Sequence, residues 1–152
     1  MKKHLFAFAL IVCSGLVQAN HIPTCLDLNL YQMEVGQSCL TEKDGAFTRV
    51  KVTEELEAWK DEQGLLWSDW MGKANHYVAM DECALLGMHL PSKSEYKLAV
   101  EHGLKQIDFD FYKRPFWGTE IHDGGSMAHV HHSSIRGQYG FRRGHFSYRC
   151  VK

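Results

Sequence analysis

The chain has 152 residues, of which 45% are hydrophobic and 23% charged, and its formal net charge at pH 7 is −1. This length is enough for one hydrophobic core, and no repeat, low-complexity stretch or linker marks the start of a second domain. The nearly balanced charge argues against the basic surface that nucleic-acid binding requires. We therefore expect one domain and no nucleic-acid partner.

The amino end has the pattern of a secretory signal peptide. Two lysines precede an apolar run from Leu5 to Val12, and the sequence up to Ala19 fits a signal-peptidase cleavage site. The apolar run is too short to span a bilayer, and no second run of spanning length follows. The sequence therefore predicts a signal peptide over residues 1–19, cleavage after Ala19, no transmembrane segment, and a periplasmic or secreted protein.

The cysteine pattern agrees with export. In the alternative of a lipoprotein signal Cys13 would be lipidated, but the residue before it is not small. Removal of residues 1–19 leaves four cysteines and changes the net charge to −3. An even number of cysteines in an exported chain predicts two disulfides, for which three pairings exist. Cys25 and Cys39 are close enough to close a small loop, and Cys83 with Cys150 would then close a long one.

Strand patterns begin after the second cysteine of the small loop. An imperfect alternation of side chains over residues 46–52 predicts a strand. Over residues 56–68, two runs with apolar side chains flank the polar turn Asp61-Glu-Gln-Gly64, which predicts a hairpin. We expect its two indoles, Trp59 and Trp67, in the core, and exposed platforms for sugar stacking are the alternative.

Two helices are predicted in the middle of the chain, over residues 73–86 and 93–102. Gly87 can adopt the left-handed conformation that ends the first helix. Ser92 and Glu95 have the spacing of a capping box for the second helix, worth on the order of 1 kcal/mol. We interpret this joint as a structural element without chemistry of its own.

The last third of the chain favours loops and strands. We expect a loop over 108–115, strands over 116–121, 127–133 and 146–151, a turn over 123–126, and a Gly-rich loop or irregular hairpin over 137–144. Two helices followed by a run of strands argue for an α+β domain.

Four motifs follow one another in the order and spacing of a known family. They are Asp61-Glu-Gln-Gly64-Leu-Leu-Trp67, Ala79-x-x-x-Cys83-x-x-x-Gly87-x-x-Leu90-Pro91-Ser92-x-x-Glu95, Phe116-Trp117-Gly-Thr and Arg149-Cys150-Val151. Together they resemble the bacterial Lcl C-terminal domain, also called the DUF1566 family. The resemblance covers residues 46–152 and leaves residues 20–45 as an amino-terminal segment with the small disulfide loop.

The resemblance implies a C-type lectin-like fold, in which two helices pack on small twisted antiparallel sheets. It also implies a disulfide from the first helix to the last strand, at the positions of Cys83 and Cys150, and a structural role for Arg149. The Glu-Pro-Asn, Gln-Pro-Asp and Trp-Asn-Asp motifs of calcium-dependent sugar binding are missing from this sequence. We therefore expect calcium-independent binding and no cofactor.

Basic and aromatic side chains gather after residue 104, in the region that corresponds to the long loops. The candidate ligand-binding residues are Arg136, Tyr139, Arg142, Arg143 and His145. Such a surface suits an acidic glycan or a protein ligand, and an ordinary solvated face is the alternative. Domains of the family stand at the tips of collagen-like bacterial adhesins, which implies an adhesive function.

Histidines on the predicted strand over 127–133 offer a second interpretation. His129 and His131 project from the same face of a strand and could bind Zn²⁺ or Cu²⁺ if a third ligand converged on them. The sequence shows no third ligand at a suitable spacing, so a solvated polar strand is the alternative.

The sequence therefore predicts a non-catalytic binding module that recognises a glycan or a protein at a cell surface or in the envelope. The alternatives are a metal-binding envelope protein and a small enzyme related to the sulfatase-modifying group, which would need a free thiol. The sequence lacks a nucleophile elbow, a His-Glu-x-x-His motif, a P-loop and a dinucleotide fingerprint. A homo-oligomer remains open, because lectin-like domains often act as dimers or trimers.

Overall fold

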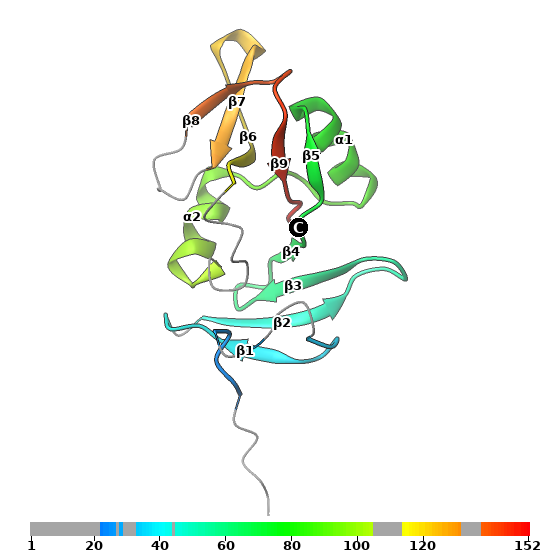
Figure 1. Ribbon diagram of the computed structural model, residues 1–152, viewed down its shortest axis with the longest axis vertical. Helices are drawn as coiled ribbons and strands as arrows, with labels where there is room; N and C mark the ends of the chain where they lie inside the picture. The colour runs from blue at the N-terminus through cyan, green and yellow to red at the C-terminus, as the bar shows by residue number, and fades with distance from the viewer. Residues whose placement is uncertain (1–21, 27, 29–32, 44, 105–113, 132–137) are drawn as a thin grey trace, which may run out of the picture.

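The computed structural model describes residues 22–26, 28, 33–43, 45–104, 114–131 and 138–152. Over these residues the chain forms two β-sheets and two α-helices (Figure 1). The four-stranded sheet crosses the lower part of the view, and the five-stranded sheet and both helices lie above it. The α+β expectation is confirmed, whereas the predicted signal peptide lies outside the described residues.

The first sheet is antiparallel and follows the order of the chain. Its strands are β1 (Ser38–Leu40), β2 (Ala46–Lys51), β3 (Glu57–Asp61) and β4 (Leu66–Ser68). The predicted hairpin is β3 and β4, with Trp59 directly opposite Trp67. Both indoles are buried, which confirms the core interpretation. Asp61 fixes the turn, because its carboxylate accepts hydrogen bonds from the Leu65 amide at 2.8 Å and from the Trp67 indole at 3.0 Å.

The second sheet has the order β5-β9-β6-β7-β8. Its strands are β5 (Gly72–Ala74), β6 (Phe116–His122), β7 (Met127–His131), β8 (Gln138–Phe141) and β9 (Phe146–Tyr148). All neighbours are antiparallel except β6 and β9, which pair in parallel at Phe116 and Ser147. The stretch expected to be a Gly-rich loop or irregular hairpin therefore contributes β8 as an edge strand of this sheet.

The first helix, α1 (His76–Leu85), begins three residues later than the sequence predicts. Lys73 lies instead in β5, and the Asn75 side chain caps the helix by accepting from the Val78 amide at 3.0 Å. The second helix, α2 (Lys93–Glu101), has the predicted capping box: the Ser92 hydroxyl accepts from the Glu95 amide, and the Glu95 carboxylate accepts from the Ser92 amide. Gly87 lies between the helices with φ at 67°, as expected.

A bulge in β6 joins the second sheet to the start of α2. Between Trp117 and Ile121, β6 has two more residues than the facing stretch of β7. Within this bulge the Thr119 hydroxyl donates to the Leu90 carbonyl at 2.7 Å, and a Glu120 oxygen accepts from the Lys93 amide at 2.5 Å. The bulge thereby fixes the position of α2 against the sheet.

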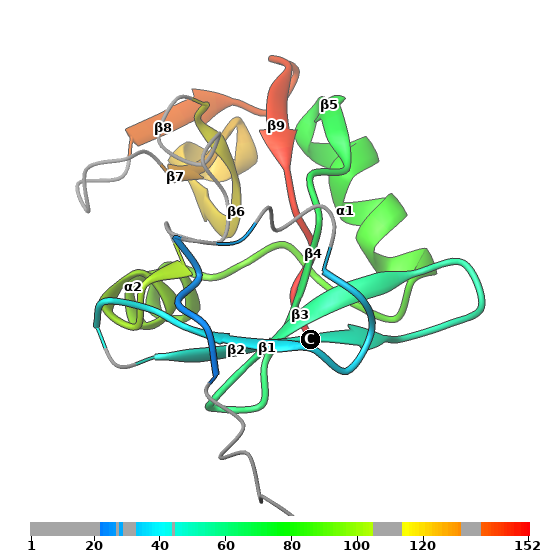
Figure 2. The same ribbon diagram turned by 60° about the horizontal axis from the view of Figure 1, so that its bottom comes forward.

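The end of the chain joins the two sheets. The Leu66 and Ser68 amides of β4 donate to the carbonyls of Lys152 and Cys150, at 2.8 and 2.9 Å. Figure 2 shows β9 leaving the second sheet and the carboxyl end reaching the first. Val151 is fully buried and exchanges two backbone hydrogen bonds with His89. Arg149, Cys150 and Val151 are therefore part of the buried interior.

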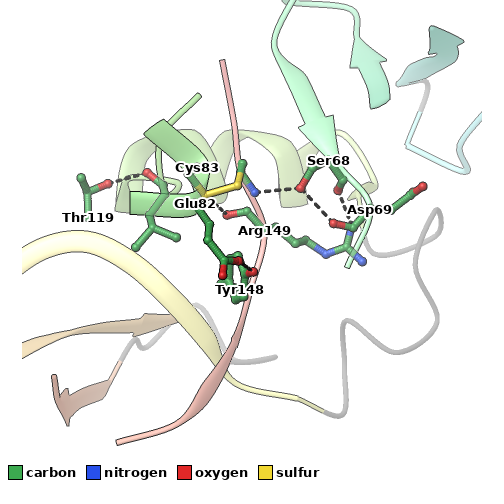
Figure 3. Close-up of a disulfide and its surroundings, with 9 residues drawn as sticks. Ser68, Asp69, Glu82, Cys83, Thr119, Tyr148 and Arg149 are labelled. Carbon is green, nitrogen blue, oxygen red and sulfur yellow. Dashed lines mark hydrogen bonds between the residues drawn. A yellow bond between two sulfur atoms is a disulfide. The ribbon is translucent and has the colours of Figure 1, made fainter. Parts of the chain in front are cut away.

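Both expected disulfides are present, Cys25–Cys39 and Cys83–Cys150. Figure 3 shows the second of them between α1 and the last segment of the chain, with Ser68 and Arg149 on the opposite side. The Ser68 hydroxyl accepts from the Cys150 amide, and its carbonyl accepts from the Arg149 guanidinium, each at 2.8 Å. These contacts agree with a structural role for Arg149.

Candidate functional site

One face of the strands β6, β7 and β8 carries a group of imidazole, aromatic and thioether side chains. The pairing places His122 opposite Met127, and Met127 opposite Phe141. Two residues further along β7, His129 lies opposite Tyr139. Because side chains alternate along a strand, these residues project from the same face. We call His122, Met127, His129, Tyr139 and Phe141 the imidazole–aromatic face.

The rings on this face form a continuous series from the surface into the core. His122 stacks on Tyr139 with centroids 4.5 Å apart, and Tyr139 meets the edge of His129 at 5.6 Å. His129 then meets His131 at 4.7 Å, and His131 lies 4.3 Å from Tyr96 of α2. His122 is exposed and His131 is only 1% exposed, so one end of the series is open to ligands and the other is structural.

The buried end holds His131 in the neutral form. Its Nε2 lies 2.9 Å from the Pro91 carbonyl, and a Cβ on Gly118 would approach that nitrogen to 2.6 Å. Burial lowers the pKa of His131 to about 4, against the opposing effect of the Pro91 hydrogen bond. A neutral ring that donates from Nε2 leaves its Nδ1 without a proton.

His129, next to it, is 2% exposed, and its Nδ1 has no hydrogen-bond partner. Burial lowers the pKa of His129, while the charge of Glu120 acts in the opposite direction. One oxygen of Glu120 accepts from the Lys93 amide, and the other is buried without a partner. The Nδ1 of His131 is also buried without a partner, and buried polar atoms without hydrogen bonds are unusual in a protein interior.

The pair of His129 and His131 does not form the metal site considered from the sequence. Among the residues that the structure describes, no group of three His, Cys, Asp or Glu side chains could hold a metal ion. The third ligand for Zn²⁺ or Cu²⁺ is therefore missing in the described part of the chain.

Arg142, a predicted ligand-binding residue, is occupied by contacts within the fold. Its Nε donates to His76 Nδ1 at 3.0 Å, and a terminal nitrogen donates to the Gly125 carbonyl at 3.2 Å. The guanidinium also covers the Tyr77 ring at 4.0 Å and approaches the Met80 sulfur at 3.8 Å. These contacts join the β8–β9 turn to α1, so Arg142 positions the site rather than offering a free cation.

The other predicted ligand residues differ in what the structure places beside them. Arg143 and His145 are exposed in the turn between β8 and β9, and Tyr139 is 45% exposed on β8. Arg136 lies outside the described residues. The structure therefore places Tyr139 on the edge strand β8, and Arg143 and His145 in the turn that leads from β8 to β9.

Two exposed aromatic residues were missed by the sequence analysis. Phe141 is 70% exposed on the imidazole–aromatic face. Trp70, in the link between β4 and β5, is 49% exposed, and the Arg114 guanidinium lies 4.8 Å from its ring. Phe141 could have been found from its two-residue spacing to Tyr139, but Trp70 gives no such signal.

The cysteines and helices bear on two other expectations. Cys25, Cys39, Cys83 and Cys150 are all in disulfides, so none of the four is a thiol nucleophile. Disulfides are typical of proteins that fold in oxidising compartments, in agreement with export. No helix in the described ranges has the length and apolar character needed to cross a membrane.

No protein-family model matches the sequence, and no curated protein is significantly similar to it.

Proposed function

We propose that this chain is an exported, non-catalytic module that binds a glycan, independently of calcium, with an adhesin-like role at a cell surface or in the envelope. Membership of the Lcl C-terminal family and a C-type lectin-like scaffold are part of this proposal. One observation carries it: two aromatic rings, Tyr139 and Phe141, lie exposed on the same face of an edge strand.

Exposed aromatic surface of this kind usually marks a binding site, because it is costly to leave in water. Aromatic rings offer a flat apolar face and, in tyrosine, a polar group at the rim, which suits the alternating C–H and hydroxyl surface of a sugar. His122 stacks on one side of Tyr139 and enlarges the platform. The platform is therefore better suited to a sugar ring than to a deeply inserted side chain.

The platform is held rigidly, which reduces the entropy that binding would cost. β8 pairs with β7 over four residues, from Gln138 to Phe141. The following turn is attached to α1 through Arg142 and His76, and a Cβ on Gly140 would meet the Phe146 ring at 2.7 Å. Phe146 thus lies close to the face of β8 that carries Gly140, on the side of the strand opposite Tyr139 and Phe141.

The charges beside the platform favour an acidic sugar. Arg143 and His145 are exposed at the end of β8, and the described residues place only Asp123 among the exposed carboxylates of the neighbouring turn. An exposed guanidinium attracts a carboxylate or sulfate without displacing contacts of the fold. Arg143 is therefore the cleaner test of the charge than Arg142, whose contacts are structural.

The test is a glycan array with acidic and neutral oligosaccharides, followed by calorimetry with the best binder. We expect Tyr139→Ala and Phe141→Ala each to weaken binding by on the order of tenfold, or about 1.4 kcal/mol. Arg143→Gln should weaken binding to acidic sugars and leave neutral ones unchanged. Leu85→Ala is the matched control, because Leu85 is 86% exposed on α1.

The outcome that contradicts the proposal is equally defined. Binding that survives Tyr139→Ala and Phe141→Ala together would place the site elsewhere. No binding to any sugar on the array would overturn the glycan assignment. A protein that the unsubstituted chain captures, and that the Tyr139→Ala and Phe141→Ala variants do not, would then replace the glycan as the ligand.

A further inference from the structure

We propose that His122, Met127 and His129, on the imidazole–aromatic face, bind one soft monovalent metal ion, with Cu⁺ as the physiological class. This inference does not depend on glycan binding. It rests on the pairing of β6 with β7, on the unpartnered nitrogen of His129, and on the chemical softness of the three side chains.

The strand pairing brings the three side chains together. His122 and Met127 are directly opposite each other at the end of the β6–β7 hairpin, where side chains of opposite residues start about 5 Å apart. His129 follows Met127 on the same face, about 7 Å along the strand. Tyr139 contacts both His122 and His129, so the two imidazoles border the same ring. The pairing therefore places His122, Met127 and His129 next to one another on one face of the sheet, beside the Tyr139 ring.

Buried polar atoms without partners lie close to the proposed site. The Nδ1 atom of His129 is buried without a hydrogen bond, a state that costs free energy and that a bound ion would relieve. The charges of Glu120 and Lys93 act on His129 in opposite directions, and one Glu120 oxygen is buried without a partner. With so little net charge around His129, a divalent ion would leave more uncompensated charge beside a buried side chain than a monovalent ion would.

The ligand set selects a soft ion. A methionine thioether binds Cu⁺ and Ag⁺ but is a poor ligand for Zn²⁺, Mg²⁺ or Ca²⁺, and imidazole binds copper well. Structural Zn²⁺ needs four ligands of the His, Cys or carboxylate type, and the described residues offer no group of even three. His131 is not among the three proposed ligands, because its Nε2 is held at the Pro91 carbonyl and the ring is only 1% exposed.

The experiment titrates the purified protein with Ag⁺, which keeps its oxidation state, in chloride-free buffer by calorimetry. A parallel anaerobic titration measures Cu⁺ by competition with a chromophoric chelator. We expect one equivalent of each ion to bind, and Met127→Leu to weaken the affinity at least tenfold. Leucine and methionine are close in volume, so this variant should keep the fold, which circular dichroism checks.

Two matched variants control for nonspecific binding to methionine and histidine. Met80 is 37% exposed on α1 and His145 is exposed after β8, both outside the proposed site. Met80→Leu and His145→Gln should leave the affinity unchanged, while His129→Gln should abolish binding. If His129→Gln does not fold, protection is the second readout: Ag⁺ should slow the peroxide oxidation of Met127, followed by mass spectrometry.

Three results would overturn the inference. They are the absence of a saturable first equivalent, equal affinities for Met127→Leu and the unsubstituted protein, and Zn²⁺ binding that depends on His131 rather than on Met127. If Phe141→Ala loses glycan binding and keeps Ag⁺ binding, glycan binding and metal binding are independent of each other.

Discussion

The two disulfides provide a matched pair for testing how a cross-link stabilises this fold. Cys25–Cys39 spans 14 residues and Cys83–Cys150 spans 67. All four cysteines are at most 1% exposed, so replacing either pair by alanine leaves a similar loss of buried contacts. The difference between the two double variants therefore isolates the effect of loop length.

The chain-entropy model gives the size of that difference. Closing a loop of 67 residues restricts the unfolded chain by about 4.4 kcal/mol at 25 °C, and closing one of 14 residues by about 3.0 kcal/mol. We expect Cys83→Ala/Cys150→Ala to lower the free energy of unfolding by about 1.4 kcal/mol more than Cys25→Ala/Cys39→Ala. The native contacts of Ser68 should hold the last segment in place in both variants.

The assay is urea unfolding at pH 7, followed by circular dichroism and by tryptophan fluorescence. Removing a cross-link expands the unfolded state, so the dependence of the unfolding free energy on urea should steepen, and more so without Cys83–Cys150. An equal or larger loss on removing Cys25–Cys39 would refute the loop-length reasoning. The stabilisation would then come from packing in the folded state.

Three further predictions concern single side chains. Burial lowers the pKa of His76, and the charge of Arg142 acts in the same direction, so the stabilisation by the neutral ring is present above pH 6.5 and is lost as the pH falls below 6.5. His76→Gln should therefore reduce the fall in melting temperature between pH 7 and pH 5. An unchanged slope of melting temperature against pH would contradict this. Gly118→Ala should cost about 1–3 kcal/mol in urea unfolding, because the new Cβ would lie 2.6 Å from His131 Nε2 and 3.2 Å from a carbonyl oxygen; a neutral result would show that the ring can move. Ser92→Ala should cost about 1 kcal/mol by removing the α2 cap, measured in the same way, and an equal cost for an exposed residue of α2 outside the cap, such as Lys97→Ala, would refute the capping argument.

Local signals predicted much of the fold. The hairpin around Asp61 and Gly64, the capping box at Ser92 and the helix end at Gly87 all depend on neighbours within a few residues, and all are present. The even cysteine count predicted two disulfides, and the pairing that joins Cys83 to the chain end is the one observed.

The errors occur where contacts between distant residues decide the structure. β5 is only three residues long and is stabilised by pairing with β9, some seventy positions away, so Lys73 was placed in the helix that follows. The contacts of Arg142, a candidate ligand-binding residue, could not be foreseen because nothing near it in the sequence pairs with it. Its partners His76 and Gly125 come from other elements.

The candidate site was predicted in part for the same reason. Tyr139 and His129 were each identified, but as members of separate sites, whereas the pairing of β7 with β8 makes them direct neighbours. Met127 was not considered, because a lone methionine in a strand gives no signal until its opposite residue is known. The expectations for Arg136 and for the loop over 108–115 concern residues outside the described ranges.

The contacts of residues 150–152 have a consequence for how fast the domain folds. Cys150 and Lys152 accept the hydrogen bonds of β4, and Val151 pairs with His89, so the edge of the first sheet and the joint between the helices both depend on a segment far along the chain. Such contacts form only after a long loop has closed, and the entropy of that closure comes before any stabilisation. We therefore expect this domain to fold more slowly than a helical bundle of the same size.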